Sequence, residues 1–235
     1  MIQTPLVLRI PQLDDPAFAH GFSTSALGSV GLTHAPDPVP VLASRRAFAR
    51  AVGIGDQPLT TLGAVHGSTV ARVDEPKDVL QGVDGLITNS KGVALFATYA
   101  DCYPIVLWDP VTRSVGLAHA GWRGTVAGVA KATVKAMHDE FGSAPENIRA
   151  GIGPGICGRC YEVGTEVASQ FDAKFVTPPG DRFLLDLAAA NRVQLEESGV
   201  TDVHVLGICT KETDFLPSHR RAPDGTRFGA IVGLR

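Results

Sequence analysis

The sequence predicts an α+β fold. Short apolar runs typical of strands cluster between residues 59 and 119, and helical and strand-like segments alternate after them. This order favours α+β over a regular βαβ repeat. Of the 235 residues, 44% are hydrophobic and 19% are charged, which is typical of a globular protein. The length is that of one large domain or two small ones.

Four segments have the apolar spacing of amphipathic helices. Between Thr125 and Phe141 the apolar residues recur with a period near 3.6, and Gly142 follows as a stop signal. The last of the four segments is followed by Gly199, in the position of a C-terminal cap. The expected helices are 41–52, 125–141, 161–175 and 185–198.

Ten short apolar runs predict strands. Several of them adjoin turn signals, such as Val83-Asp84-Gly85 and Trp108-Asp109-Pro110. The expected strands are 6–10, 59–65, 69–73, 85–88, 93–98, 105–108, 114–118, 148–151, 203–206 and 228–232.

Charge and composition exclude several classes of protein. The formal net charge of −3 argues against a broad nucleic-acid binder. We find no apolar stretch near the roughly 18 residues of a membrane span, and the N-terminus lacks the basic region of a signal peptide. Four cysteines in 235 residues do not form a disulfide scaffold. We therefore expect a cytoplasmic protein with reduced thiols and no nucleic-acid or membrane partner.

Three of the predicted strands end in side chains that bind metals. His66, Cys102 and His119 each follow or close an apolar run. If these strands share a sheet, the three side chains converge at one edge. Two imidazoles and a thiolate suit Zn²⁺, and three protein ligands leave a fourth position for water, as in catalytic zinc sites. The spacings of 36 and 17 residues match no short metal motif, however, and isolated histidines and cysteines are more often structural.

A glycine-rich turn and a basic cluster are two further candidate sites. The turn, residues 151–164, contains Cys157 and Cys160 in a C-x-x-C pattern. That pattern is compatible with half of a zinc site or a redox pair, but there is no second C-x-x-C, and two plain thiols are the favoured interpretation. The basic cluster includes His219 and Arg220, and arginines suit phosphate or carboxylate groups.

Several motifs together resemble the YfiH family, known both as polyphenol oxidoreductase (laccase-like) and as purine nucleoside phosphorylase. The resemblance extends from about residue 59 to residue 235. The matching stretches are Val65-His66-Gly67, Ala100-Asp101-Cys102-Tyr103-Pro104, His119-Ala120-Gly121-Trp122-Arg123-Gly124, Ile152-Gly153-Pro154, Tyr161-Glu162-Val163-Gly164, Leu185-Asp186-Leu187 with Asn191, and Ser218-His219-Arg220-Arg221.

The resemblance implies one α+β domain over residues 1–235, with layers of mixed β-sheet and flanking helices. It implies one zinc ion on His66, Cys102 and His119, with copper as the second possible metal. It also implies phosphorolysis of adenosine, inosine and methylthioadenosine, and deamination of adenosine, by a monomer or small homo-oligomer.

Under the hypothesis of a zinc-dependent purine nucleoside enzyme, four further residues are candidates for specific roles. Arg123 is the first candidate for binding phosphate and Arg220 the second. His219 is the candidate for contacting ribose or purine. Asp101, next to a metal ligand, is the candidate for proton transfer or for orienting that ligand.

Three competing functions are compatible with the same residues. They are a copper-dependent polyphenol oxidase, a thiol hydrolase with Cys102 as nucleophile and His119 as base, and a catalytically weak metal-binding paralogue. The last is supported by departures from the family pattern in the first quarter of the chain. Ser25, Ser44 and Ala64 replace the Arg, Asn and Gln usual in the family.

Overall fold

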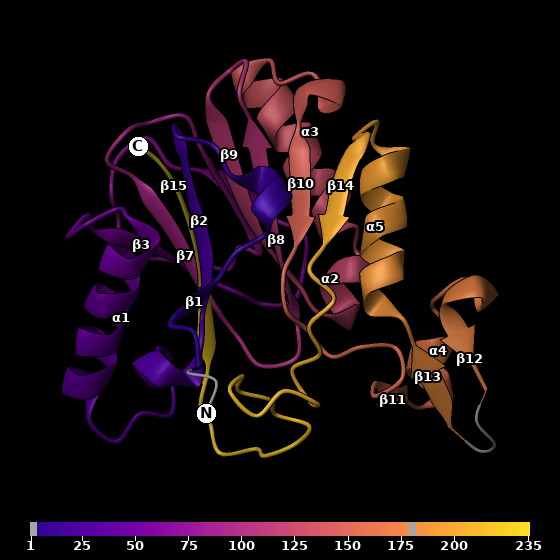
Figure 1. Cartoon of the computed structure of the whole chain (residues 1–235). Helices are drawn as coiled ribbons and strands as arrows, with labels where there is room; N and C mark the ends of the chain where they lie inside the picture. The colour runs from indigo at the N-terminus through magenta and orange to yellow at the C-terminus, as the bar shows by residue number, and fades with distance from the viewer. Residues whose placement is uncertain (1–3, 179–181) are drawn as a thin grey trace.

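The computed structural model describes residues 4–178 and 182–235, and it confirms the α+β class. Two six-stranded mixed sheets lie face to face, and helices cover the outer face of each (Figure 1). The result is a helix–sheet–sheet–helix arrangement with an additional three-stranded sheet beside it. In the described residues, no helix is both long and apolar enough to cross a membrane.

The first sheet has the strand order β1-β2-β15-β7-β3-β5. Its central strands are antiparallel, and β3 and β5 join them in parallel. The apolar runs of the sequence did not predict β2 or β5. The strands are β1 (Val7–Leu8), β2 (Phe18–Ser23), β15 (Phe228–Leu234), β7 (Ala94–Tyr99), β3 (Leu59–Gly63) and β5 (Val79–Gln81).

The second sheet has the order β14-β10-β8-β9-β6-β4. Strands β8 and β9 pair along their full lengths, from Tyr103 opposite Ala120 to Asp109 opposite Ser114. All six strands were predicted from their apolar runs. They are β14 (Asp202–Val205), β10 (Arg149–Ile152), β8 (Tyr103–Asp109), β9 (Ser114–Ala120), β6 (Gly85–Thr88) and β4 (Val70–Arg72).

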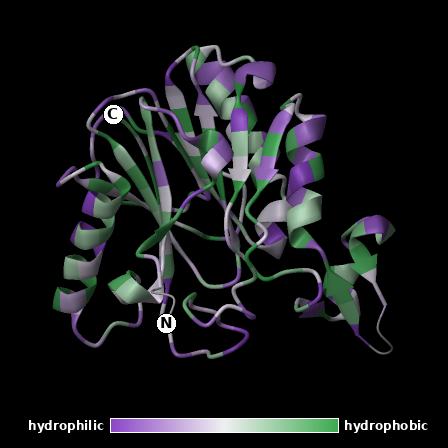
Figure 2. Cartoon of the chain, in the orientation of Figure 1, coloured by the Kyte–Doolittle hydropathy of each residue, from purple (hydrophilic) through white to green (hydrophobic). Residues whose placement is uncertain are grey.

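The core lies in three layers. Between the sheets, Phe18 and Phe22 of the first sheet pack with Trp108 of the second. Outside the first sheet, Phe48 of α1 (Pro38–Val52) packs on Phe96. Helices α3 (Val129–Phe141) and α5 (Leu187–Glu197) cover the second sheet in the same way. In Figure 2, hydrophilic and hydrophobic residues alternate along α1 and α5, as expected for helices with one buried face.

The helix predicted over 125–141 is interrupted. The chain forms α2 (Trp122–Val126) and then α3, because Gly128 between them has a φ of 79°. A positive φ is easily adopted only by glycine, so this residue ends one helix and starts the next at a different angle.

The continuous helix predicted over 161–175 is wrong. This segment instead forms β11 (Glu162–Val163), α4 (Thr165–Ala168) and a 3₁₀ turn over Ala173–Phe175. Its regularly spaced apolar residues all pack against the same core cluster, so burial satisfies the pattern without one helix. Strand β11 joins β13 (Phe183–Leu185) and β12 (Val176–Thr177) in the small sheet that projects beyond α5 in Figure 1.

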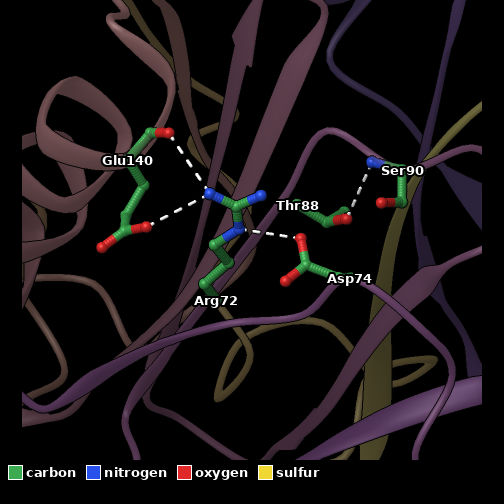
Figure 3. Close-up of polar contacts among 5 residues, drawn as sticks. All are labelled: Arg72, Asp74, Thr88, Ser90 and Glu140. Carbon is green, nitrogen blue, oxygen red and sulfur yellow. Dashed lines mark hydrogen bonds and ion pairs between the residues drawn. The ribbon is translucent and has the colours of Figure 1, made fainter.

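A polar network ties the edge strand β4 to α3. The Arg72 guanidinium lies 2.7 Å from a carboxylate oxygen of Asp74 and 3.2 Å from one of Glu140 (Figure 3). The same guanidinium lies over the ring of Phe141, at 5.0 Å from its centroid. The contacts of Arg72 are at the surface and support the fold rather than the candidate site. The bond from the Ser90 N–H to the Thr88 hydroxyl, also drawn in Figure 3, is a further local contact of the fold.

Candidate metal centre

His66, Cys102 and His119 converge as the sequence predicts. One donor atom from each lies within 4.8 Å of the others. The three side chains meet without the shared sheet that the sequence suggested as the way to bring them together. His66 follows β3 of the first sheet and His119 lies on β9 of the second, while Cys102 lies in the turn by which the chain passes from β7 to β8. The centre therefore lies at the junction of the two sheets.

Asp84 fixes the loop that carries His66. Its carboxylate is fully buried and accepts hydrogen bonds from the backbone N–H groups of three successive residues, at 3.1, 2.7 and 2.7 Å, from Val65, His66 and Gly67. His66 has a φ of 62°, which a non-glycine residue adopts only where the surroundings enforce it. The Asp84 carbonyl also accepts the backbone N–H of His119 at 2.8 Å, so one residue positions two of the three ligands.

His119 is buried as a neutral imidazole. Its Nδ1 is enclosed and has no hydrogen-bond partner in the described part of the chain, while the Tyr99 ring stacks on it at 5.1 Å. Burial lowers the pKa of His119 to about 3, and the charge of the neighbouring His66 acts in the same direction. A neutral imidazole keeps one nitrogen lone pair available for a cation.

Cys102 is held as a thiol in the absence of a cation. Burial raises its pKa to about 12; the charge of Asp101 also raises it, and Arg227 opposes both. A cation bound by the sulfur would replace that proton. Gly121 leaves room at this point, because a Cβ there would lie 2.9 Å from the Cys102 Sγ and 3.0 Å from His66 Cδ2.

These donors fit a zinc ion. The two imidazoles and one thiol are ligands that Zn²⁺ and copper both accept, and a set of three protein ligands leaves one coordination position open. The convergence of two imidazoles and one thiol, with donor atoms within 4.8 Å of one another, favours a metal over a purely structural histidine.

Two cavities adjoin the centre. The larger, of about 570 Å³, is lined by all three ligands and by Arg45, Ala64, His219 and Arg227 among others. Ala64, where the family usually has Gln, therefore lies on the cavity wall. Arg45 also lies there, and it directly follows Ser44, where the family usually has Asn. The smaller cavity, of about 140 Å³, is lined by residues that include Cys102, Trp122, Tyr161, His219 and Arg220. Cys102 and His219 line both.

Asp101 connects the centre to the C-terminal segment. Its φ is 84°, and its carboxylate accepts three bonds of 2.7 Å: from the hydroxyls of Thr210 and Ser218 and from the backbone N–H of Arg220. The carboxylate thus holds the segment that presents His219 and Arg220 to the cavities. This contact pattern is that of a positioning residue.

Arg220 lines the smaller cavity, whereas Arg123 lines neither cavity but packs on Trp122, which lines the smaller one. The Arg123 guanidinium lies over the Trp122 ring at 4.2 Å. The Arg220 guanidinium lies over the Tyr161 ring at 5.0 Å and donates to the Glu162 carbonyl at 2.8 Å. Burial raises the pKa of Tyr161 to about 12, and both arginine charges oppose that rise. Two cationic groups are therefore close to the smaller cavity.

Sequence reasoning missed Asp84, Tyr99 and the anchors Thr210 and Ser218. In the sequence, Asp84 stands out only as part of a turn signal. An aspartate directly before a continuous apolar strand is a candidate for a buried carboxylate, but nothing in the sequence pairs it with residues 65–67.

The fold and the candidate centre define an α+β protein in which two histidines and one cysteine that could hold a metal ion meet at the junction of two mixed sheets. The chain belongs to the family described as multi-copper polyphenol oxidoreductase laccase, whose model matches residues 19–235.

Curated relatives in this family carry the names of purine enzymes. The chain is 41% identical over 240 residues to a purine nucleoside phosphorylase of Deinococcus radiodurans, covering 97% of this chain and 92% of the relative. It is 35% identical over 187 residues to adenosine deaminase RL5 from an unknown prokaryotic organism, covering 72% and 71%. Among solved structures, YlmD from Geobacillus stearothermophilus is 30% identical with a TM-score of 0.90, covering 100% of this chain and 98% of that one.

Proposed function

We propose that this chain is a zinc-dependent purine nucleoside phosphorylase that uses His66, Cys102 and His119 as its metal ligands. The observation that carries the proposal is the convergence of these three donors on the wall of a cavity of about 570 Å³. That volume lies within the usual range for small-molecule sites, about 300–1,000 Å³. The names of the relatives supply the substrate class.

The metal, when bound, supplies Lewis acidity beside the open coordination position. The residues of the chain bind and orient the reactants. Arg123 and Arg220 bind phosphate near the smaller cavity, because guanidinium groups form paired hydrogen bonds with phosphate oxygens. His219 lines both cavities and contacts the ribose or the purine between them. Asp101 holds His219 and Arg220 in place through its three hydrogen bonds.

Adenosine deamination is a second candidate activity. It is favoured by the relative named adenosine deaminase, and it uses the same ligands with water in place of phosphate. Both reactions are compatible with one site, since a nucleoside occupies the same cavity in each.

A thiol hydrolase, a copper oxidase and a weak paralogue have less support. A nucleophilic cysteine needs a lowered pKa, and burial raises the pKa of Cys102. Burial also keeps the neighbouring His119 neutral, so there is no imidazolium beside the thiol to lower its pKa. A multicopper phenol oxidase needs several copper centres, and this centre provides a single set of three ligands. The substitution at Ala64, on the cavity wall, supports altered substrate range or a weak enzyme.

Turnover of nucleosides with and without phosphate tests the proposal. Zinc-loaded protein is incubated with inosine, adenosine or methylthioadenosine, and the products are separated by chromatography. Free base and the sugar 1-phosphate (ribose 1-phosphate, or methylthioribose 1-phosphate from methylthioadenosine), formed only with phosphate, are the expected result. Inosine formed from adenosine without phosphate indicates the deaminase activity, and no product from any nucleoside would refute both.

A further inference from the structure

A second group of metal-binding side chains lies outside the candidate centre. Donor atoms of Cys157, Cys160, Cys209 and Glu212 all lie within 4.8 Å of one another, and the group shares no residue with the first centre. We call it the Cys₃Glu cluster. Cys209 is buried, Cys157 and Cys160 are half-buried and Glu212 is exposed, so ions in solution have access to it.

The fold brings two short motifs together to form the cluster. The first is the C-x-x-C of the glycine-rich turn, and the second is Cys209-Thr210-Lys211-Glu212, a C-x-x-E motif 52 residues further on. Gly155 pairs with Cys209 in a β-bridge, and its carbonyl accepts the Thr210 N–H at 3.0 Å. In the second motif a glutamate stands where a second C-x-x-C would have its last cysteine.

The donor atoms of the two motifs face one another, as they would around a bound ion. The backbone N–H of Cys157 donates to the Cys209 Sγ at 3.3 Å, a contact that stabilises negative charge on the sulfur. The thiols of Cys157 and Cys160 donate to the two oxygens of Glu212, at 3.8 and 3.4 Å. Around a tetrahedral zinc ion, sulfur and carboxylate oxygen are about 3.5 Å apart and two sulfurs about 3.8 Å. The two sulfur–oxygen distances in the cluster are close to the first of these values, and all of its donor atoms lie within 4.8 Å of one another.

We propose that the Cys₃Glu cluster binds a second zinc ion as a closed structural site. Four protein ligands complete a tetrahedron and leave no position for water, unlike the first centre. Three thiolates favour zinc over calcium or magnesium, which prefer oxygen ligands. Arg159 offsets part of the excess negative charge, because its guanidinium lies 3.0 Å from a Glu212 oxygen.

The site braces the segment that approaches the first centre. Thr210 directly follows Cys209, and its hydroxyl donates to Asp101, the neighbour of Cys102. An ion in the cluster therefore fixes the glycine-rich turn to the segment that Asp101 anchors. Zinc that binds only the folded chain stabilises it, so its removal lowers the melting temperature.

Metal stoichiometry tests this proposal separately from the proposed activity. Protein stripped with a chelator is reloaded with Zn²⁺, freed of excess ion by gel filtration and analysed by plasma mass spectrometry. We expect two zinc ions per chain in the wild type. We expect one in Cys102→Ala and one in the double variant Cys157→Ser, Cys160→Ser. Arg159→Ala is the control: it removes a group that pairs with Glu212 but none of the four ligands, so this variant should keep two zinc ions.

Cobalt substitution identifies the ligands even if the double variant folds poorly. Loaded with Co²⁺, the Cys102→Ala variant retains only the cluster, so strong thiolate-to-cobalt charge-transfer bands with a tetrahedral d–d spectrum are expected. A zinc content that the double variant Cys157→Ser, Cys160→Ser retains in full, or no metal in Cys102→Ala, would overturn the proposal, whereas one zinc per wild-type chain that the double variant loses would contradict only the first centre. A count of two rather than four free thiols in the unfolded, unreduced protein would also overturn the proposal, because it reveals a disulfide in place of the site.

Discussion

The carboxylate of Asp84 lies 2.7 Å from the backbone nitrogen of His66, and this bond links a buried charge to the conformation of a metal ligand. The same carboxylate accepts the N–H groups on either side, and the Asp84 carbonyl holds the His119 backbone. Asp84, which lies outside the candidate metal-binding set, thus positions two of its three members.

Asp84→Asn tests that dependence. The amide replaces one carboxylate oxygen by a donor that faces a backbone N–H, so we expect a loss of about 3 kcal/mol in the free energy of unfolding. We also expect zinc affinity to fall by about 10–100-fold, as for other residues that orient metal ligands. Chelator competition measures the affinity. Asp74→Asn, which removes an exposed carboxylate paired with Arg72, is the matched control and should change neither quantity appreciably.

Asp101→Asn tests the anchoring of the C-terminal segment. The variant weakens the bonds to Thr210, Ser218 and the Arg220 backbone, and we expect KM for substrate to rise by about tenfold with zinc content unchanged. A fall in kcat with no change in KM would instead assign the carboxylate to proton transfer. Asp224→Asn, in the same segment and bonded to Thr226, is the control.

Arg123→Lys tests phosphate binding. Lysine keeps the charge but loses the paired donors of guanidinium, so we expect KM for phosphate to rise by about tenfold while zinc stays bound. Initial rates against phosphate concentration measure this. Arg192→Lys on α5, paired with Glu196, provides the control. Unchanged phosphate dependence in Arg123→Lys would show that the guanidinium only packs on Trp122.

His20 gives the fold a dependence on pH that is separate from the metal centre. Its Nε2 accepts the Ile10 N–H at 3.0 Å, and burial lowers its pKa from 6.5 to about 4. Below pH 6.5 the unfolded chain therefore binds a proton that the folded chain does not, and stability falls as the pH drops toward 4. The loss from this group reaches about 3 kcal/mol, at 1.36 kcal/mol per pH unit.

Urea unfolding at several pH values checks this. His20→Gln keeps an acceptor but does not titrate, so its unfolding free energy should fall less steeply between pH 6.5 and 4 than that of the parent. His34→Gln, at an exposed position, should follow the parent. Identical slopes for parent and His20→Gln would contradict the assignment.

The three metal ligands were predictable because each ends a short apolar run, and such ends gather at the edges of sheets. Their division between two sheets was not predictable, since the sheet that a strand joins depends on its pairing partners and not on its own residues. The helix expected over 161–175 failed for a related reason: the spacing records which residues are buried, and a strand, a short helix and a turn bury them equally well.

The sequence showed only half of the Cys₃Glu cluster, the C-x-x-C motif, and it did not show the role of Asp84. Cys157 and Cys209 meet across 52 residues, through the pairing of Gly155 with Cys209. Asp84 acts through backbone N–H groups 17–19 residues before it. Contacts of this kind depend on the final packing of the chain and leave no local pattern.

The phosphorolysis rate of Cys102→Ala tests the central claim most directly. The rate of free-base release from inosine, with phosphate and Zn²⁺ present, is compared between this variant and the wild type, with circular dichroism to verify the fold. Since only two imidazoles remain to hold the first ion, we predict a loss of at least about 100-fold together with loss of that ion. A folded Cys102→Ala protein that turns over inosine at the wild-type rate would contradict the account.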